Sequence, residues 1–153
     1  MTTKTIVLHH LCGHRFIGHT EAGDRIPVDG DQPAIGPKPT DLLLAALGSC
    51  TAYDVIDIMA KKRQPLAHYR IEVVGTQADT HPRRFTHITV THYGAGPAVT
   101  EAALARSAEL SHTRYCAVAA TLNAEIAIKT VVEPWDPDQV MGSQEDNSGS
   151  SNV

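Results

Sequence analysis

The chain has 153 residues, a formal net charge of −4 at pH 7, and 42% hydrophobic residues. This composition supplies one hydrophobic core, so residues 1–137 are predicted to form a single domain. Aromatic residues make up only 5%, and the positive charges are scattered apart from Lys61–Arg63, which argues against a nucleic-acid partner. The N-terminus lacks a signal-peptide layout, and the apolar run around Leu42 is too interrupted to span a bilayer. We therefore expect a soluble, cytoplasmic protein with no membrane partner.

The first part of the chain is predicted to form a small antiparallel meander. Residues 3–11, 15–19 and 25–29 are rich in β-branched and apolar side chains, and glycine-containing turns separate them. Residues 29–38 contain several prolines and glycines and are predicted to be a connecting loop.

A long helix is predicted over residues 40–62. Pro39 suits the first turn, Thr40 or Asp41 can satisfy free backbone N–H groups there, and Pro65 ends the segment. The helix is apolar nearly all round, so other elements should enclose it. One small sheet and one further helix cannot cover it, and we therefore expect a homodimer in which a second copy covers the rest.

The second part of the chain is predicted to contain two longer strands, two helices and a last strand. The two strands are expected at 67–77 and 84–93, and the alternation of the second slips at Thr86–His87. A helix capped by Thr100 is expected over 100–111 and a short helix over 111–122. An edge or closing strand is expected over 124–133. The fold class is therefore α+β. Residues 138–153 contain few apolar side chains and are predicted to be a disordered tail.

Two of the three cysteines are candidates for thiol chemistry. Cys50 lies in the long apolar helix, and Cys116 lies near the start of the short one, where the helix dipole would lower its pKa. Free cysteines most often only fill space in a core, which is the alternative interpretation for both. Their spacing in the chain does not show whether the two sulfur atoms meet.

The remaining cysteine and the histidines around it do not form a convincing metal site. His9 and His10 are adjacent on a predicted strand and therefore point to opposite faces, and no CxxC or HxxxH spacing accompanies Cys12 and His14. We expect no metal site, and Cys12 is interpreted as a bystander.

Two motifs resemble those of the OsmC/Ohr family, the osmotically induced and organic-hydroperoxide-resistance proteins. They are GPKPTDLLLAALGSCTAYDVIDIMAKKRQ around Cys50 and LSHTRYCAVAATL around Cys116, and the similarity extends from about Phe16 to Val132 with most likeness to the OsmC-like branch. The resemblance implies an OsmC-like fold, with antiparallel sheets around two long central helices in an intertwined homodimer.

The resemblance also implies a cofactor-free thiol peroxidase that reduces organic, lipophilic hydroperoxides to alcohols. Cys50 matches the cysteine that attacks the peroxide and Cys116 the resolving cysteine, so that the implied cycle passes through a Cys50 sulfenic acid and a Cys50–Cys116 disulfide. The implied reductant is a dithiol, often a lipoyl-type donor. An apolar pocket around Cys50 would favour lipophilic peroxides over H₂O₂.

The sequence departs from the family pattern at the residues that activate the thiol. The resemblance implies an activating arginine from the N-terminal strands, held by a glutamate at the start of the central helix. Thr40 occupies the glutamate position, and Asp41, one residue on, is the candidate to replace the glutamate. Arg15 is the preferred arginine and Arg25 the alternative. A non-enzymatic binding protein for a small lipophilic ligand and a thiol redox sensor remain alternative functions on the same fold.

Overall fold

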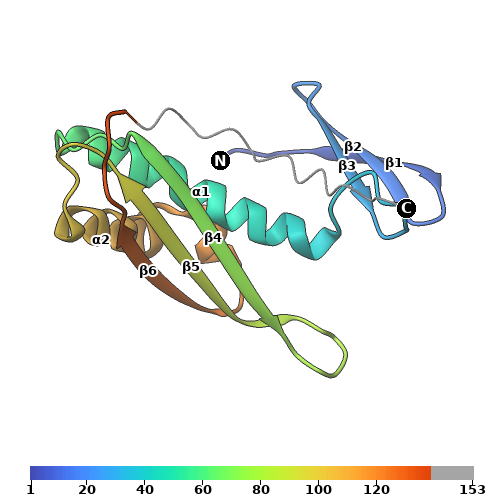
Figure 1. Cartoon of the computed structure of the whole chain (residues 1–153). Helices are drawn as coiled ribbons and strands as arrows, with labels where there is room; N and C mark the ends of the chain where they lie inside the picture. Colours follow the sequence, from blue (N-terminus) through green and yellow to red (C-terminus); the bar gives the residue numbers. More distant parts are fainter. Residues whose placement is uncertain (139–153) are drawn as a thin grey trace, which may run out of the picture.

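A computed structural model describes residues 1–138 of the chain. Its elements, in chain order, are β1 (Ile6–Cys12), β2 (Arg15–Thr20), β3 (Arg25–Asp29), α1 (Pro39–Lys61), β4 (His68–Gln77), β5 (Phe85–Ala95), α2 (Glu101–Leu110), a π-helical turn η1 (Ser111–Tyr115), α3 (Ala117–Thr121) and β6 (Glu125–Val132). The α+β fold class is confirmed (Figure 1). The predicted tail, residues 138–153, lies outside the described residues except for Asp138.

The first sheet contains β1, β2 and β3 in that order, with both pairings antiparallel, as predicted. It lies near the start of α1, apart from the second sheet (Figure 1). Every residue of β1 is exposed, and four of its large apolar side chains keep between 50 and 55% of their surface in contact with solvent (Ile6, Val7, Leu8 and Leu11). This sheet therefore contributes little to the hydrophobic core of the single chain.

The second sheet has the order β4-β5-β6. β4 and β5 are antiparallel, and the predicted slip at Thr86–His87 is a bulge at which Thr76 pairs with His87 and Gln77 with Phe85. β6 lies at the edge, as predicted, but it runs parallel to β5, so the expectation of purely antiparallel sheets is wrong. The reason is the crossover through α2, η1 and α3, which returns the chain to the end where β5 began.

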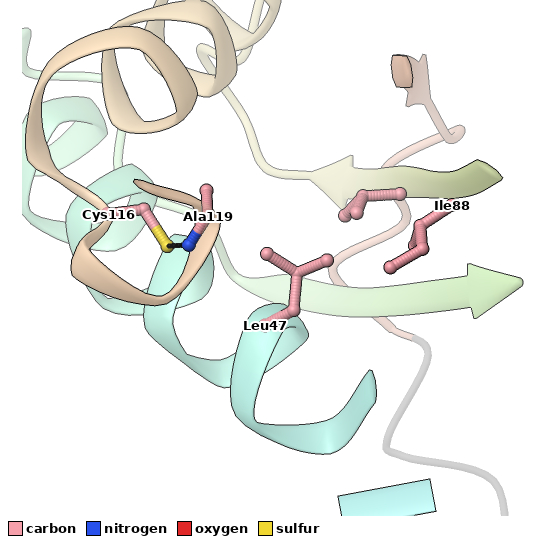
Figure 2. Packing of buried hydrophobic residues seen from close by; sticks show 5 residues of the cluster. Leu47, Ile88, Cys116 and Ala119 are labelled. Atoms are coloured by element: carbon pink, nitrogen blue, oxygen red, sulfur yellow. Dashed lines mark hydrogen bonds between the residues drawn. The ribbon is translucent and has the colours of Figure 1, made fainter. Parts of the chain in front are cut away.

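The helices α1 and α2 pack on the same face of the second sheet, with α1 over β4 and α2 over β6 (Figure 1). α1 comes close to β4 at Gly48, where an added Cβ atom would lie 2.9 Å from a methyl carbon of Val73. The buried core has two parts along this interface. The part near the cysteines contains Leu47, Ile88, Val90, Cys116 and Ala119 (Figure 2), and the part beyond it contains Val55, Met59, Ala103, Leu104 and Ala108.

The helix α1 is long and apolar enough, by length and composition alone, to cross a membrane. Its contacts with β4, α2, η1 and α3 show instead that it is the core helix of a soluble fold. One side of α1 is not covered in the single chain, because Leu43, Tyr53 and Ile56 remain 44%, 70% and 46% exposed. The expected enclosure of this helix is thus only partly achieved within one chain.

A buried histidine on β5 faces this core. His92 is fully buried, its Nδ1 atom forms a 2.7 Å hydrogen bond with the hydroxyl of Tyr69, and its Nε2 atom has no partner among the described residues. Burial lowers the pKa of His92 from 6.5 to about 4, because the charged imidazolium loses its hydration there. Folding therefore requires the neutral form of this side chain above about pH 4.

We expect this histidine to make the protein less stable in mild acid. The unfolded chain binds a proton at His92 below about pH 6.5 and the folded chain does not, so the free energy of unfolding falls as pH falls from 6.5 towards 4. Between pH 7.5 and pH 5, His92 should lower the free energy of unfolding by about 2 kcal/mol. Urea unfolding at both pH values measures this difference.

Two variants test this assignment. His92→Gln keeps an acceptor for Tyr69 but cannot titrate, so its stability should change less between the two pH values. His87→Gln, on the exposed face of the same strand, should retain the pH dependence of the original protein. Equal pH dependence in both variants would contradict the role of His92.

Candidate functional site

Cys116 is held at the junction of η1 and α3. Its backbone N–H donates to the carbonyl of Ser111 at 2.8 Å, which closes the π-helical turn, and it is the residue that precedes the first turn of α3. Its Sγ atom accepts a hydrogen bond from the N–H of Ala119 at 3.3 Å (Figure 2). The side chain is only 3% exposed, so the thiol belongs to the hydrophobic core as well as to the site.

The predicted effect of the helix start on Cys116 is wrong in direction. Burial raises the pKa of Cys116 to about 11, and this effect exceeds the lowering by the Ala119 N–H group. The neighbouring Cys50 thiol raises the pKa further. Cys116 is therefore a protonated thiol at neutral pH.

Cys50 lies in α1 and packs against the same cluster of core residues. It is half-buried, whereas Cys116 is buried, and both are free thiols. The interaction of the Cys50 thiol with Cys116 shows that the fold brings the two side chains together, although they lie far apart in the chain. Whether the two sulfur atoms come within disulfide reach stays a prediction.

A polar contact that the sequence did not predict connects η1 to α1 beside the cysteines. Ser111 is fully buried, and its hydroxyl donates to the Asp54 carboxylate at 2.8 Å. Asp54 lies one helical turn after Cys50, and the carbonyl of Ser111 is the acceptor for Cys116 N–H. This hydrogen bond therefore fixes the segment that carries Cys116 against the segment that carries Cys50. No local pattern marks Ser111, because its partner lies in a distant element.

Arg15 lies on β2 and forms its hydrogen bonds within the first sheet and the following loop. Its Nε–H group donates to the Asp29 carboxylate at 2.9 Å, and its Nη2 group donates to the carbonyl of Pro33 at 2.7 Å. Asp29 is 1% exposed; burial raises its pKa, but the N–H groups of Ile35 and Asp31 and the charge of Arg15 lower it more. Arg15 is thus oriented by Asp29, and none of its hydrogen bonds in residues 1–138 reaches Cys50.

Asp41 caps the start of α1. Its Oδ2 atom accepts the backbone N–H of Lys38 at 3.0 Å, which confirms the expectation that this residue can satisfy a free donor there. Asp41 makes no ion pair with Arg15 in the described part of the chain. The structure therefore brings Cys50 and Cys116 together, and within one chain it leaves Arg15 and Asp41 in other contacts.

An apolar cavity of about 320 Å³ lies between α1 and β4, next to the turn of α1 that precedes Cys50. Its walls are formed by Leu44, Ala45, Gly48, Ser49, Ile71 and Val73. Within residues 1–138, no group of three or more His, Cys, Asp or Glu side chains is placed to hold a metal ion. The arrangement is that of a thiol pair with an apolar surface beside it.

Comparison with known proteins identifies relatives over most of this chain. The model of a family described as OsmC-like protein matches residues 29–131. Protein YhfA of Escherichia coli is 34% identical over 116 residues, which cover 76% of this chain and 87% of that protein.

Solved structures share the fold. The crystal structure of a hypothetical protein from Aquifex aeolicus has 30% sequence identity and a TM-score of 0.75, covering 88% of this chain and 100% of that one. The organic hydroperoxide resistance protein OhrB of Bacillus subtilis has 13% identity and a TM-score of 0.59, covering 85% of this chain and 98% of its own. At that identity the likeness to OhrB is one of fold alone.

Proposed function

The chain belongs to the OsmC-like protein family, and from this premise we propose that it is a thiol peroxidase for organic hydroperoxides. The observation that carries the proposal is the proximity of Cys50, which packs against an apolar cluster, to Cys116, which belongs to it. OhrB, which shares the fold, is named for organic hydroperoxide resistance. A pair of adjacent free thiols with different exposure suits a two-step oxidation better than simple packing.

The first step of the proposed reaction takes place at Cys50. Its thiolate attacks the outer oxygen of R–OOH, the O–O bond breaks, and the leaving alkoxide takes up a proton to give R–OH. Cys50 becomes a sulfenic acid, and the peroxide is reduced by two electrons. Cys50 is the more accessible of the two thiols, which supports its role as the attacking group.

The second step uses Cys116. Its sulfur attacks the sulfur of the Cys50 sulfenic acid, an S–S bond forms, and the thiol proton and the hydroxyl group leave as water. Because burial raises its pKa to about 11, Cys116 is protonated at neutral pH and is a poor nucleophile towards the peroxide itself. An external dithiol, such as a lipoyl-type donor, then reduces the disulfide and is itself oxidised to a disulfide.

The substrate class follows from the surroundings of the thiols. The cavity of about 320 Å³ next to the helical turn that precedes Cys50 is lined mostly by apolar atoms of α1 and β4. Burying an alkyl chain there stabilises the complex by roughly 0.8 kcal/mol for each CH₂ group, a gain that H₂O₂ cannot obtain. We propose a cytoplasmic location as well, where such thiols are kept reduced between cycles.

The test is the consumption of cumene hydroperoxide and of H₂O₂ by the reduced protein, with dithiothreitol or dihydrolipoamide as the donor. Turnover that prefers the organic peroxide would support the proposal. Absence of turnover with both donors, from a protein whose thiols still titrate, would exclude it.

One observation favours a second function, the binding of a small lipophilic ligand without catalysis. Within one chain, Arg15 is bonded to Asp29 and Asp41 to the backbone of Lys38, so neither activates Cys50 there. Without a guanidinium beside it, a thiolate at Cys50 would have no cationic partner to stabilise it. A protein of this kind would bind a ligand in the apolar site equally well with Cys50 replaced by serine.

We also propose that the protein is a homodimer. Tyr53 and Ile56 form an exposed apolar stripe on α1, at 70% and 46% exposure, on the side not covered by the second sheet. The exposed apolar strand β1 belongs to a sheet with few contacts to the rest of its own chain. A second copy could cover both surfaces, and its first sheet could bring the oriented Arg15 to Cys50 of the opposite chain.

Replacing Ile56 with glutamate should break the dimer, because it places a charge in the middle of the proposed interface. Light scattering after size exclusion should give twice the chain mass of 16.4 kDa for the original protein and the single mass for the variant. Val74→Glu is the matched control, since Val74 is 54% exposed on the sheet face opposite α1 and should leave the dimer intact. A monomeric original protein at micromolar concentration would contradict the proposal.

A further inference from the structure

A second cavity, of about 200 Å³, lies where the start of α1 meets the start of β5 and the connection from α3 to β6. Its lining includes Thr40, Arg83, Arg84, Phe85, Ile88 and Leu122. It is separate from the cavity between α1 and β4, and apart from Thr40, which occupies the family's glutamate position, none of its lining residues has a part in the proposed reaction.

The inner wall of this cavity is apolar and continuous with the core. Phe85, Leu122 and Ala124 pack against the cluster that contains Leu47 and Cys116, and Ile88, which is 1% exposed, belongs to that cluster. A polar group placed against this wall would lose its hydration without gaining a hydrogen bond. The wall therefore suits an aliphatic chain.

The remaining wall carries two arginines. The Nη1 group of Arg84 donates to the carbonyls of Phe85 and Asn123, both at 3.3 Å, which holds the guanidinium between β5 and the segment before β6. Within residues 1–138, neither Arg83 nor Arg84 has a carboxylate within ion-pair distance, and the nearby Glu125 pairs with His87 at 3.3 Å. The Nε–H and Nη2–H groups of Arg84 have no partner in this part of the chain and remain available to an anion.

We propose that this cavity binds a small aliphatic anion, with its acidic head on Arg84 and Arg83 and its alkyl chain against Phe85, Ile88 and Leu122. A cavity of about 200 Å³ has room for a short alkyl chain. The head group is a carboxylate or a phosphate, both of which guanidinium groups bind through charge-assisted hydrogen bonds. This inference goes beyond the peroxidase proposal and does not depend on turnover.

The probes are octanoate, octyl phosphate and 1-octanol, titrated calorimetrically into the reduced full-length protein. Octanoate or octyl phosphate should bind at least about tenfold more tightly than octanol, because only they form charge-assisted hydrogen bonds. The anion that binds more tightly identifies the preferred head group. Equal binding of all three compounds would overturn the proposal.

Variants locate the binding. Arg84→Gln should lower the affinity for the anion by about tenfold or more and leave the affinity for octanol unchanged. Arg84→Lys should restore part of the lost affinity. Arg83→Gln should lower the affinity for the anion by a smaller factor. Arg63→Gln is the control, because Arg63 follows the opposite end of α1. Unchanged anion affinity in Arg84→Gln would also overturn the proposal.

A Cys50→Ser protein separates this site from the proposed reaction. It should bind the anion as the original protein does, even though it has lost the reactive thiol. In the original protein, anion binding without peroxide turnover would refute the peroxidase proposal alone, and turnover without anion binding would refute the present one alone.

Discussion

Replacing Cys50 with serine should reduce hydroperoxide consumption to the rate of the thiol donor alone. A serine hydroxyl stays protonated at neutral pH and forms no sulfenic acid, so the O–O bond has no nucleophile to break it. The measurement is the initial rate with cumene hydroperoxide and dihydrolipoamide, followed beside the original protein at equal concentration. A Cys50→Ser protein that keeps more than a small fraction of the original rate would exclude Cys50 as the attacking group.

Cys116→Ser should behave differently from Cys50→Ser. The first oxidation should still occur, so one equivalent of peroxide is consumed, but the sulfenic acid has no internal partner and persists or oxidises further. A dimedone-type sulfenic acid probe should therefore label Cys116→Ser and not Cys50→Ser after one addition of peroxide. Cys12→Ser is the control, because Cys12 is exposed on β1 and lies outside this cluster.

The second large effect is expected on stability, at Leu47. This side chain is fully buried against Ile88, Val90 and Cys116 (Figure 2). Leu47→Ala removes its apolar contacts and leaves a cavity, which should lower the free energy of unfolding by about 2–5 kcal/mol. Urea unfolding at one fixed protein concentration measures the loss, since the stability of a dimer depends on concentration.

Leu43→Ala is the matched control for this prediction. Leu43 lies one turn earlier on the same helix and is 44% exposed, and the exchange alters the helix propensity by the same small amount. Leu43→Ala should lower the free energy of unfolding by less than half as much as Leu47→Ala. Similar losses for both variants would mean that the core is not centred on Leu47.

The two main helices lie where capping residues and prolines in the sequence predicted them. The helix predicted over 40–62 is observed as Pro39–Lys61, and the helix predicted from Thr100 begins at Glu101 with the Thr100 hydroxyl accepting from Ala103 N–H. Prolines, capping residues and alternating patterns act within a few residues, so their effects can be recognised without the fold.

The expectations that failed depend on distant parts of the chain. The direction of β6 is set by the crossover that precedes it, and its alternating pattern is the same in either direction. The pKa of Cys116 was expected to fall at a helix start, but burial in a core assembled from α1, β5 and α3 raises it. The expected action of Arg15 on Cys50 stays a prediction, since within one chain Arg15 is held by Asp29 and the proposed dimer would bring it to the opposite chain.

The amino-acid sequence alone was sufficient to predict the family, the α+β class, the long apolar helix and the two cysteines of interest. Each of these depends on neighbouring residues or on a recognisable motif. The meeting of Cys50 with Cys116, the Ser111–Asp54 hydrogen bond and the arginine-lined cavity required the folded chain. Each of these brings together residues from separate elements, and burial and proximity, which set their chemistry, are properties of the packing and not of any one segment.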